Sequence, residues 1–190
     1  RAPDPLAGLE PGETSRVVRV YDGDALVLDN GLTVRLAGIE APAGQRRGDR
    51  PRPAEAFSKE ARQALEDLTL GREVALFYGG SRRDRYGRAL AHLRVTDETG
   101  RTLWVNGEMI AAGAARVRTW PDTIALNDTL LAMEGPAREG GLGLWGLPDY
   151  AVREVAEQAR SPVWGFSVLR GKANGHAWRS GTCTLTFADG

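Results

Sequence analysis

The side chains best suited to chemistry in this chain are acids and arginines gathered in three short stretches. These are Tyr21–Asp24, residues 34–42 and Arg82–Arg88. Carboxylate oxygens bind hard divalent cations, and guanidinium groups grip phosphate oxygens in pairs. The combination predicts a phosphodiester site, with a metal on the acids and arginines on the phosphate.

The acids of the first two stretches are the candidate metal ligands. Gly23 lets a turn bring Asp22 and Asp24 close to one point, although Asp-Gly pairs also occur in plain turns. Glu40 ends a β-type run, where it is expected to meet Asp24 across a hairpin.

The arginines are the candidate phosphate ligands. Arg35 lies between two apolar residues of a strand, so its side chain is either exposed or lines a site. Arg85, Tyr86 and Arg88 surround a glycine in a loop that enters the next strand. Such a loop can approach a phosphate closely, which makes it the strongest local signal.

The pattern of elements indicates how these residues are positioned. Strands are expected over residues 15–21, 25–29, 33–39, 73–78 and 89–96, and helices over 53–68, 103–112 and 123–138. Asp29-Asn30-Gly31 predicts a tight hairpin between the second and third strands. Short strands with one helix after the third are typical of a small Greek-key barrel.

The chain is expected to divide along its length. Residues 1–14 are predicted to be a flexible lead, and residues 15–147 the main domain. Residues 148–162 form a helical connector, with the helix over 149–160. Residues 163–190 form a short β-type extension, which either packs on the main domain or belongs to an incomplete module.

Composition sets further limits. The 25 basic and 25 acidic residues cancel, which argues against a general nucleic-acid coat protein. No apolar run is long enough to cross a membrane, and one cysteine excludes an internal disulfide. The start at Arg1 instead of Met favours removal of an export signal, so a periplasmic or secreted location is expected.

Taken in order, these stretches resemble the staphylococcal nuclease (thermonuclease) family. That family has Asp-Gly-Asp-Thr, Arg-Leu before Asp-Thr-Pro-Glu, Asp-Lys-Tyr-Gly-Arg, Val-Asn-Glu and a closing Gly-Leu-Trp. The matching residues here are Asp22–Ala25, Arg35–Leu36, Glu40–Ala43, Asp84–Arg88, Val105–Glu108 and Gly143–Trp145. The resemblance covers residues 15–147 and implies a mainly β, α+β fold: a five-stranded antiparallel Greek-key OB-type barrel with about three helices.

The resemblance also implies roles for single residues. Asp24 and Glu40 fall on Ca²⁺ ligands, Asp22 on an outer acid, and Arg35 and Arg88 on the catalytic phosphate arginines. Three further residues are expected to contact nucleic acid: Arg85, Tyr86 and Trp120. Trp120 is either a platform for a base, where the family carries tyrosines, or an aromatic at the edge of the core.

One position departs from the family. The Glu that activates the attacking water is replaced by Ala43. Gln45, Asp49 and Glu55 are the nearby candidates to stand in; Asp49 and Glu55 can accept a proton, but neither has the right spacing. One hypothesis is therefore a weak Ca²⁺-dependent nuclease acting on single-stranded DNA or RNA, with Ca²⁺ bound weakly or not at all. The other is an inactive barrel that serves as a binding or assembly subunit and contacts a protein partner through residues 148–190.

Overall fold

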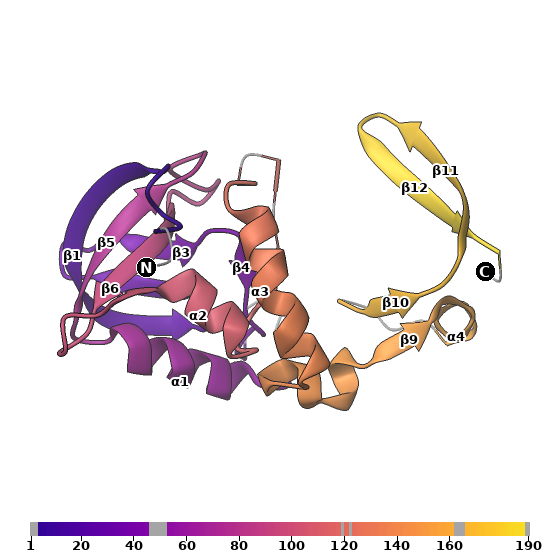
Figure 1. Ribbon diagram of the computed structural model, residues 1–190, viewed down its shortest axis with the longest axis horizontal. Helices are drawn as coiled ribbons and strands as arrows, with labels where there is room; N and C mark the ends of the chain where they lie inside the picture. The colour runs from indigo at the N-terminus through magenta and orange to yellow at the C-terminus, as the bar shows by residue number, and fades with distance from the viewer. Residues whose placement is uncertain (1–3, 46–52, 119, 122, 162–165, 189–190) are drawn as a thin grey trace. The chain divides into compact units, whose positions relative to one another are not determined.

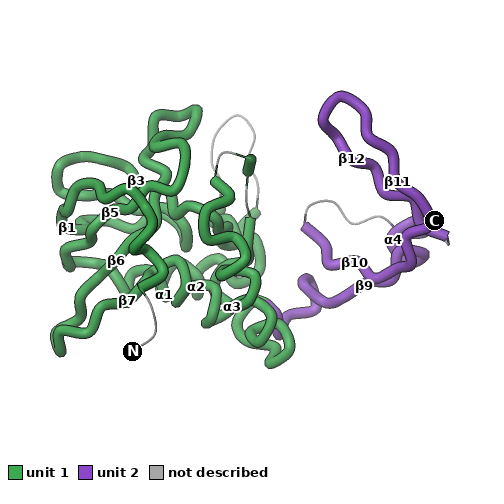
Figure 2. The backbone as a smooth tube through the Cα atoms, turned by 45° about the horizontal axis from the view of Figure 1, so that its top comes forward, with its two compact units in different colours: residues 1–144 green, residues 145–190 purple. Residues whose placement is uncertain are grey.

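The computed structural model describes residues 4–45, 53–118, 120–121, 123–161 and 166–188 (Figure 1). The chain forms two compact units, Arg1–Leu144 and Trp145–Gly190 (Figure 2). No helix in the described part is long and apolar enough to cross a membrane.

The first unit is built on a closed barrel of five strands, which confirms the predicted fold (Figure 1). They are β1 Glu10–Asp22, β2 Ala25–Leu28, β3 Thr33–Leu36, β5 Glu73–Tyr78 and β6 Ala89–Thr96. The order is β3-β2-β1-β5-β6, with β7 Thr102–Trp104 added beside β6. Four neighbouring pairs are antiparallel, but β3 and β6 close the barrel as a parallel pair. This corrects the expectation of a wholly antiparallel barrel.

Alternating apolar side chains fill the barrel. In β6, for example, Ala89, Ala91, Leu93 and Val95 are buried, since every second residue of a strand faces the same side. Helix α1 contributes Ala61 and Leu65 to the same core.

Several strand boundaries differ from the sequence-based ones. β1 begins at Glu10 and not at Ser15, because residues 10–16 pair with β5. The run expected over 33–39 is divided into β3 and β4 (Ile39–Glu40), since Gly38 adopts a positive φ of 75°. The predicted hairpin between β2 and β3 is present, with Gly31 at φ 82°.

The helices of this unit begin later than the sequence indicates. α1 spans Ser58–Thr69 and α3 spans Asn127–Glu139, each preceded by a residue with left-handed backbone, Phe57 or Leu126. α2 spans only Val105–Ala111, because the residues before it form β7.

A short strand links the helical part to the barrel. β8 (Arg116–Val117) pairs antiparallel with β4, so that Arg116 lies opposite Glu40. Its position is fixed from α3, where the buried Glu134 carboxylate accepts the Val117 N–H at 2.7 Å.

The second unit has little core of its own. The 3₁₀ turn η1 (Gly143–Gly146) leads into it, followed by η2 (Pro148–Tyr150). The single helix expected over 149–160 is wrong: β9 (Val152–Glu154) precedes α4 (Val155–Arg160), because β9 pairs with β10 (Val168–Arg170). β11 (Ala173–Arg179) and β12 (Thr182–Phe187) form an exposed hairpin.

Candidate phosphodiester site

A pocket of about 430 Å³ lies on the barrel, between the β5–β6 loop and the segment that follows β8. Its lining is dominated by arginines and aromatic rings: Arg35, Glu40, Arg83, Asp84, Arg85, Tyr86, Arg88, Leu90, Arg118, Trp120 and Pro121. Five arginines face two carboxylates there, so the lining carries a clear excess of positive charge. Such a pocket attracts an anionic ligand.

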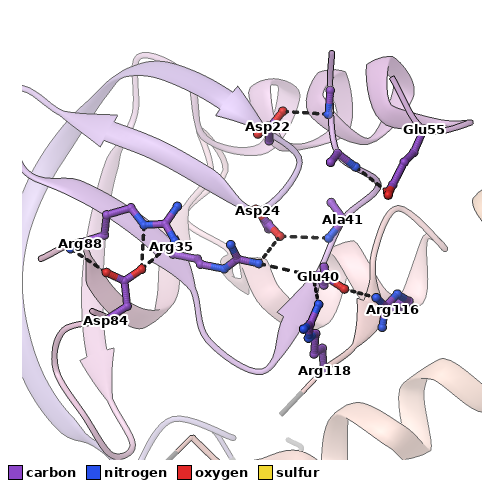
Figure 3. Close-up of polar contacts among 12 residues, drawn as sticks. Asp22, Asp24, Arg35, Glu40, Ala41, Glu55, Asp84, Arg88, Arg116 and Arg118 are labelled. Atoms are coloured by element: carbon purple, nitrogen blue, oxygen red, sulfur yellow. Dashed lines mark hydrogen bonds and ion pairs between the residues drawn. The ribbon is translucent and has the colours of Figure 1, made fainter. Parts of the chain in front are cut away.

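Arg35 is positioned by the hairpin of β2 and β3. Its guanidinium lies 3.1 Å from Asp24 Oδ2 and 3.8 Å from Glu40 Oε1 (Figure 3). Asp24 is buried, and the Ala41 N–H also donates to its Oδ2 at 3.1 Å. Burial raises the pKa of the Asp24 carboxyl, although the Arg35 charge and the Ala41 N–H act in the opposite direction.

Arg88 is positioned by Asp84, which precedes it in the same loop. Asp84 Oδ2 lies 2.7 Å from both Nε and Nη2 of Arg88, a two-point ion pair (Figure 3). The exposed Tyr86 ring lies beneath two guanidinium groups, at 4.8 Å from Arg85 and 5.3 Å from Arg88. This edge of the pocket therefore combines fixed positive charge with an open aromatic surface.

Glu40 lies between arginines from two strands. Arg116 donates to Glu40 Oε2, and Arg118 donates to Oε1 (Figure 3). The β4–β8 register places Arg116 opposite Glu40. Arg118 directly follows β8, and its backbone N–H donates to Gly38 O at 2.9 Å. Both oxygens of this carboxylate are thus engaged by guanidinium groups.

Trp120 and Arg118 form a second guanidinium–aromatic pair on the pocket wall. The Arg118 guanidinium lies 4.8 Å from the centre of the Trp120 ring. A turn fixes the tryptophan backbone: Trp120 N–H donates to Thr123 Oγ1 at 3.1 Å, and Thr123 N–H donates to Trp120 O at 2.8 Å. Trp120 is 55% exposed, which leaves room for a base to stack on its ring.

The segment after Glu40 is bound by two other carboxylates. Asp22 Oδ1 accepts the Gly44 N–H at 3.2 Å, and Glu55 Oε2 accepts the Ala43 N–H at 2.8 Å (Figure 3). Asp22, Ala43 and Glu55 are not among the described residues that line the pocket. Asp49, the other acid near Ala43, lies outside the described residues.

The acids present leave few oxygens free for a calcium ion. Within the described ranges, no three His, Cys, Asp or Glu side chains are grouped so that they could hold a metal ion. Both Glu40 oxygens already face arginines, and Asp24 Oδ2 is shared by Arg35 and the Ala41 N–H. Ca²⁺ prefers six to eight oxygens, which this arrangement does not offer.

The pocket brings together most of the residues singled out from the sequence. Six of these line it: Arg35, Glu40, Arg85, Tyr86, Arg88 and Trp120. Asp24 contacts the site through Arg35, whereas Asp22 binds the backbone of Gly44.

Sequence reasoning missed Arg116 and Arg118. Their alternation around Val117 is the sequence signal of a strand with two arginines on one side. Their target, Glu40, is 76 and 78 positions away in the chain, so only the fold reveals the contact.

Comparison with known proteins points to one family. A family model described as "Staphylococcal nuclease homologue" matches residues 33–146. A thermonuclease of Staphylococcus intermedius is 26% identical over 137 residues, covering 70% of this chain and 77% of that protein. A micrococcal nuclease of Shigella flexneri is 34% identical over 140 residues, covering 70% of this chain and 74% of that protein. A probable endonuclease LCL3 of Schizophyllum commune is 30% identical over 141 residues, covering 74% of this chain and 42% of that protein.

Proposed function

Since the chain belongs to the staphylococcal nuclease family, we propose that it binds single-stranded DNA or RNA and slowly hydrolyses phosphodiester bonds. The observation that carries this proposal is the placement of Arg35 and Arg88. They come from different parts of the barrel and line the same pocket, beside Glu40. Two guanidinium groups in one pocket suit the oxygens of one phosphate.

The chemistry of these arginines is electrostatic. A phosphodiester gains negative charge on its oxygens as the attacking oxygen bonds to phosphorus, and fixed positive charge lowers the energy of that state. Asp84 holds Arg88 in place before the substrate arrives, and Asp24 does the same for Arg35. The arginines therefore need little reorganisation during the reaction.

The rate is expected to be low because no side chain at position 43 can accept a proton. General-base assistance contributes roughly 10²- to 10⁴-fold to a reaction rate. The Ala43 methyl group offers none, and the nearby Glu55 carboxylate is already bound to the Ala43 N–H. Slow turnover is therefore expected from Ala43 and from the engagement of Glu55.

Calcium dependence, which the family resemblance implies, is expected only at high Ca²⁺ concentrations. The arginines on Glu40 compete with a cation for the same oxygens, and the Asp24 carboxylate is engaged by Arg35. A calcium ion held by so few oxygens would contribute little to activation of the attacking water.

A second candidate function is binding without catalysis, as a subunit of a larger assembly. It is favoured by the engaged Glu40 and by the β11–β12 hairpin of the second unit, where Trp178 is 68% and Leu185 56% exposed. Under this proposal residues 148–190 contact a protein partner. Exposed apolar side chains on a hairpin suit such a contact.

Digestion of heat-denatured DNA tests the two candidates. We expect slow release of acid-soluble nucleotides that falls at least about tenfold in Arg35→Gln and in Arg88→Gln, because each loses a charged hydrogen bond. Arg62→Gln, on the exposed face of α1, is the matched control. Undetectable cleavage at every Ca²⁺ concentration would favour the binding subunit, and cleavage that survives both arginine changes would contradict the assigned site.

An exported location also stays a prediction. Fractionation of cells that produce the natural full-length protein, followed by immunoblotting, tests it. Recovery in the cytoplasm alone would contradict it.

A further inference from the structure

Glu40 is engaged by two arginines that the family resemblance does not include. Arg116 and Arg118 bind opposite oxygens of this carboxylate, and β8 is held in place by Glu134 of α3. The Glu40 side chain is 19% exposed, so these pairs are partly shielded from water. A cation that enters here must first displace guanidinium groups.

The same contacts suit an anion. Carboxylate and phosphate oxygens both accept paired hydrogen bonds from a guanidinium group. Glu40 Oε1 therefore accepts a hydrogen bond from Arg118 that a phosphate oxygen can accept in its place. The Arg118 side chain is 39% exposed and lines the pocket, which makes it accessible to such a ligand.

Aromatic rings stand next to the charges on two walls of the pocket. Trp120 packs against Arg118, and Tyr86 packs near Arg88; both aromatic residues are more than half exposed. Bases of single-stranded nucleic acid stack on exposed aromatic rings while arginines bind the backbone. A pocket of about 430 Å³ lies in the range of pockets that take small ligands such as a nucleotide.

We propose that this pocket binds the backbone of single-stranded nucleic acid without a metal ion, with a phosphate replacing Glu40 at Arg118. Arg35 and Arg88 bind the phosphate from the other side, and Trp120 stacks on the neighbouring base. Arg116 keeps its pair with Glu40 while Arg118 changes partner. The inference rests on the proposed function for the class of ligand, and it adds the ligand contact at Arg118 and independence from metal.

The test is binding of a fluorescein-labelled deoxythymidine decamer, followed by fluorescence anisotropy in EDTA and in 10 mM CaCl₂. For the unmodified protein we expect dissociation constants within about twofold of each other, because the arginines supply the attraction. In EDTA, Arg118→Gln should weaken binding about tenfold or more and lower the salt dependence by about one phosphate contact. Gel analysis confirms that the decamer stays intact.

Three further variants distinguish a direct contact of Arg118 with phosphate from a role of Arg118 in the structure of the pocket. Arg118→Lys should keep the salt dependence but recover only part of the affinity, since an ammonium group binds phosphate at one point. Glu40→Gln should tighten binding severalfold, because it removes the competing carboxylate. Arg62→Gln, a matched loss of one charge outside the pocket, should leave binding within about twofold.

Each outcome decides between the proposals. Binding that requires Ca²⁺ in the unmodified protein, and loses this requirement in Glu40→Gln, would overturn the metal-free site but leave the proposed function standing. Equal affinities for Arg118→Gln and Arg62→Gln would overturn the role of Arg118 alone. Absence of binding under both conditions would overturn the inference and the proposed function together.

Discussion

Arg88 and Asp84, four positions apart, form a two-point ion pair that fixes both the loop and the direction of the guanidinium group. Asp84 Oδ1 also accepts the backbone N–H groups of Tyr86 and Arg88, at 2.9 and 3.1 Å. Burial opposes ionisation of Asp84, but the Arg88 side chain and these N–H groups outweigh it and hold the pKa of the carboxyl below its usual value. One carboxylate therefore organises this edge of the pocket.

Asp84→Asn should weaken binding of the deoxythymidine decamer by about five- to tenfold, because the charged partner that orients Arg88 is lost. Arg88→Gln should weaken it more. In the double variant the loss should equal that of Arg88→Gln alone, since Asp84 acts through Arg88. Anisotropy titrations of the unmodified protein and the three variants complete this double-mutant cycle. Strictly additive losses would show that Asp84 acts independently of Arg88.

Calcium binding should be weak, with a dissociation constant of about 1 mM or higher, because few free oxygens are available to the ion. Arg118→Gln should strengthen it severalfold, since it releases one Glu40 oxygen. Isothermal titration calorimetry with CaCl₂ measures both proteins, with Arg62→Gln as the control. Tight, stoichiometric binding by the unmodified chain would contradict the expectation, and Glu40→Asp would then make little difference.

Local patterns of the sequence were sufficient for much of the barrel. The bounds of β5 and β6 match the predicted runs, because alternation and flanking turn residues define strands locally. The helix starts were misplaced because Phe57 and Leu126 adopt a left-handed backbone, which their residue types disfavour. The parallel pairing of β3 with β6 depends on closure of the whole sheet.

Contacts of the site between residues of one loop could be predicted from the sequence, whereas contacts between strands far apart in the chain could not. The Asp84–Arg88 loop carries its own signal, since both partners lie within one turn. The pairing of β4 with β8, which brings arginines to Glu40, joins segments far apart in the chain. The sequence therefore indicated Asp24 and Glu40 as candidate metal ligands, but it did not reveal that arginines bind both oxygens of Glu40.

His92 should make the stability of the first unit depend on pH. His92 is a fully buried residue of β6, and its ring centre lies 5.7 Å from that of Trp104 in β7. Burial lowers the pKa of His92 to about 4. Its Nδ1 is one of the few buried polar atoms in the described residues without a hydrogen-bond partner. The folded chain thus holds this imidazole neutral.

The folded and unfolded chains bind protons differently at His92. Between pH 6.5 and about 4 the unfolded chain binds a proton at this position and the folded chain does not, so stability falls as the pH is lowered. The loss contributed by His92 over that window is about 3 kcal/mol. Urea unfolding at pH 7, 5.5 and 4 should show a flatter dependence for His92→Leu. The exposed His176→Leu is the control and should follow the unmodified chain; equal slopes for all three would contradict the assignment.

Position 43 carries Ala where the family has its water-activating Glu. Ala43→Glu should restore or raise Ca²⁺-dependent nuclease activity by roughly 10²-fold or more, because it supplies a proton-accepting side chain three positions after Glu40 of the pocket. Adding Glu40→Asp should raise activity further, since the shorter side chain matches the family's ligand. Release of acid-soluble nucleotides from heat-denatured DNA measures both, and Ala43→Gln, which cannot accept the proton, is the control. Strong activity of the unmodified chain that Ala43→Glu leaves unchanged would mean that another residue supplies the base. Inactivity of the double variant would favour the binding-subunit function, with the arginine pocket retained for binding alone.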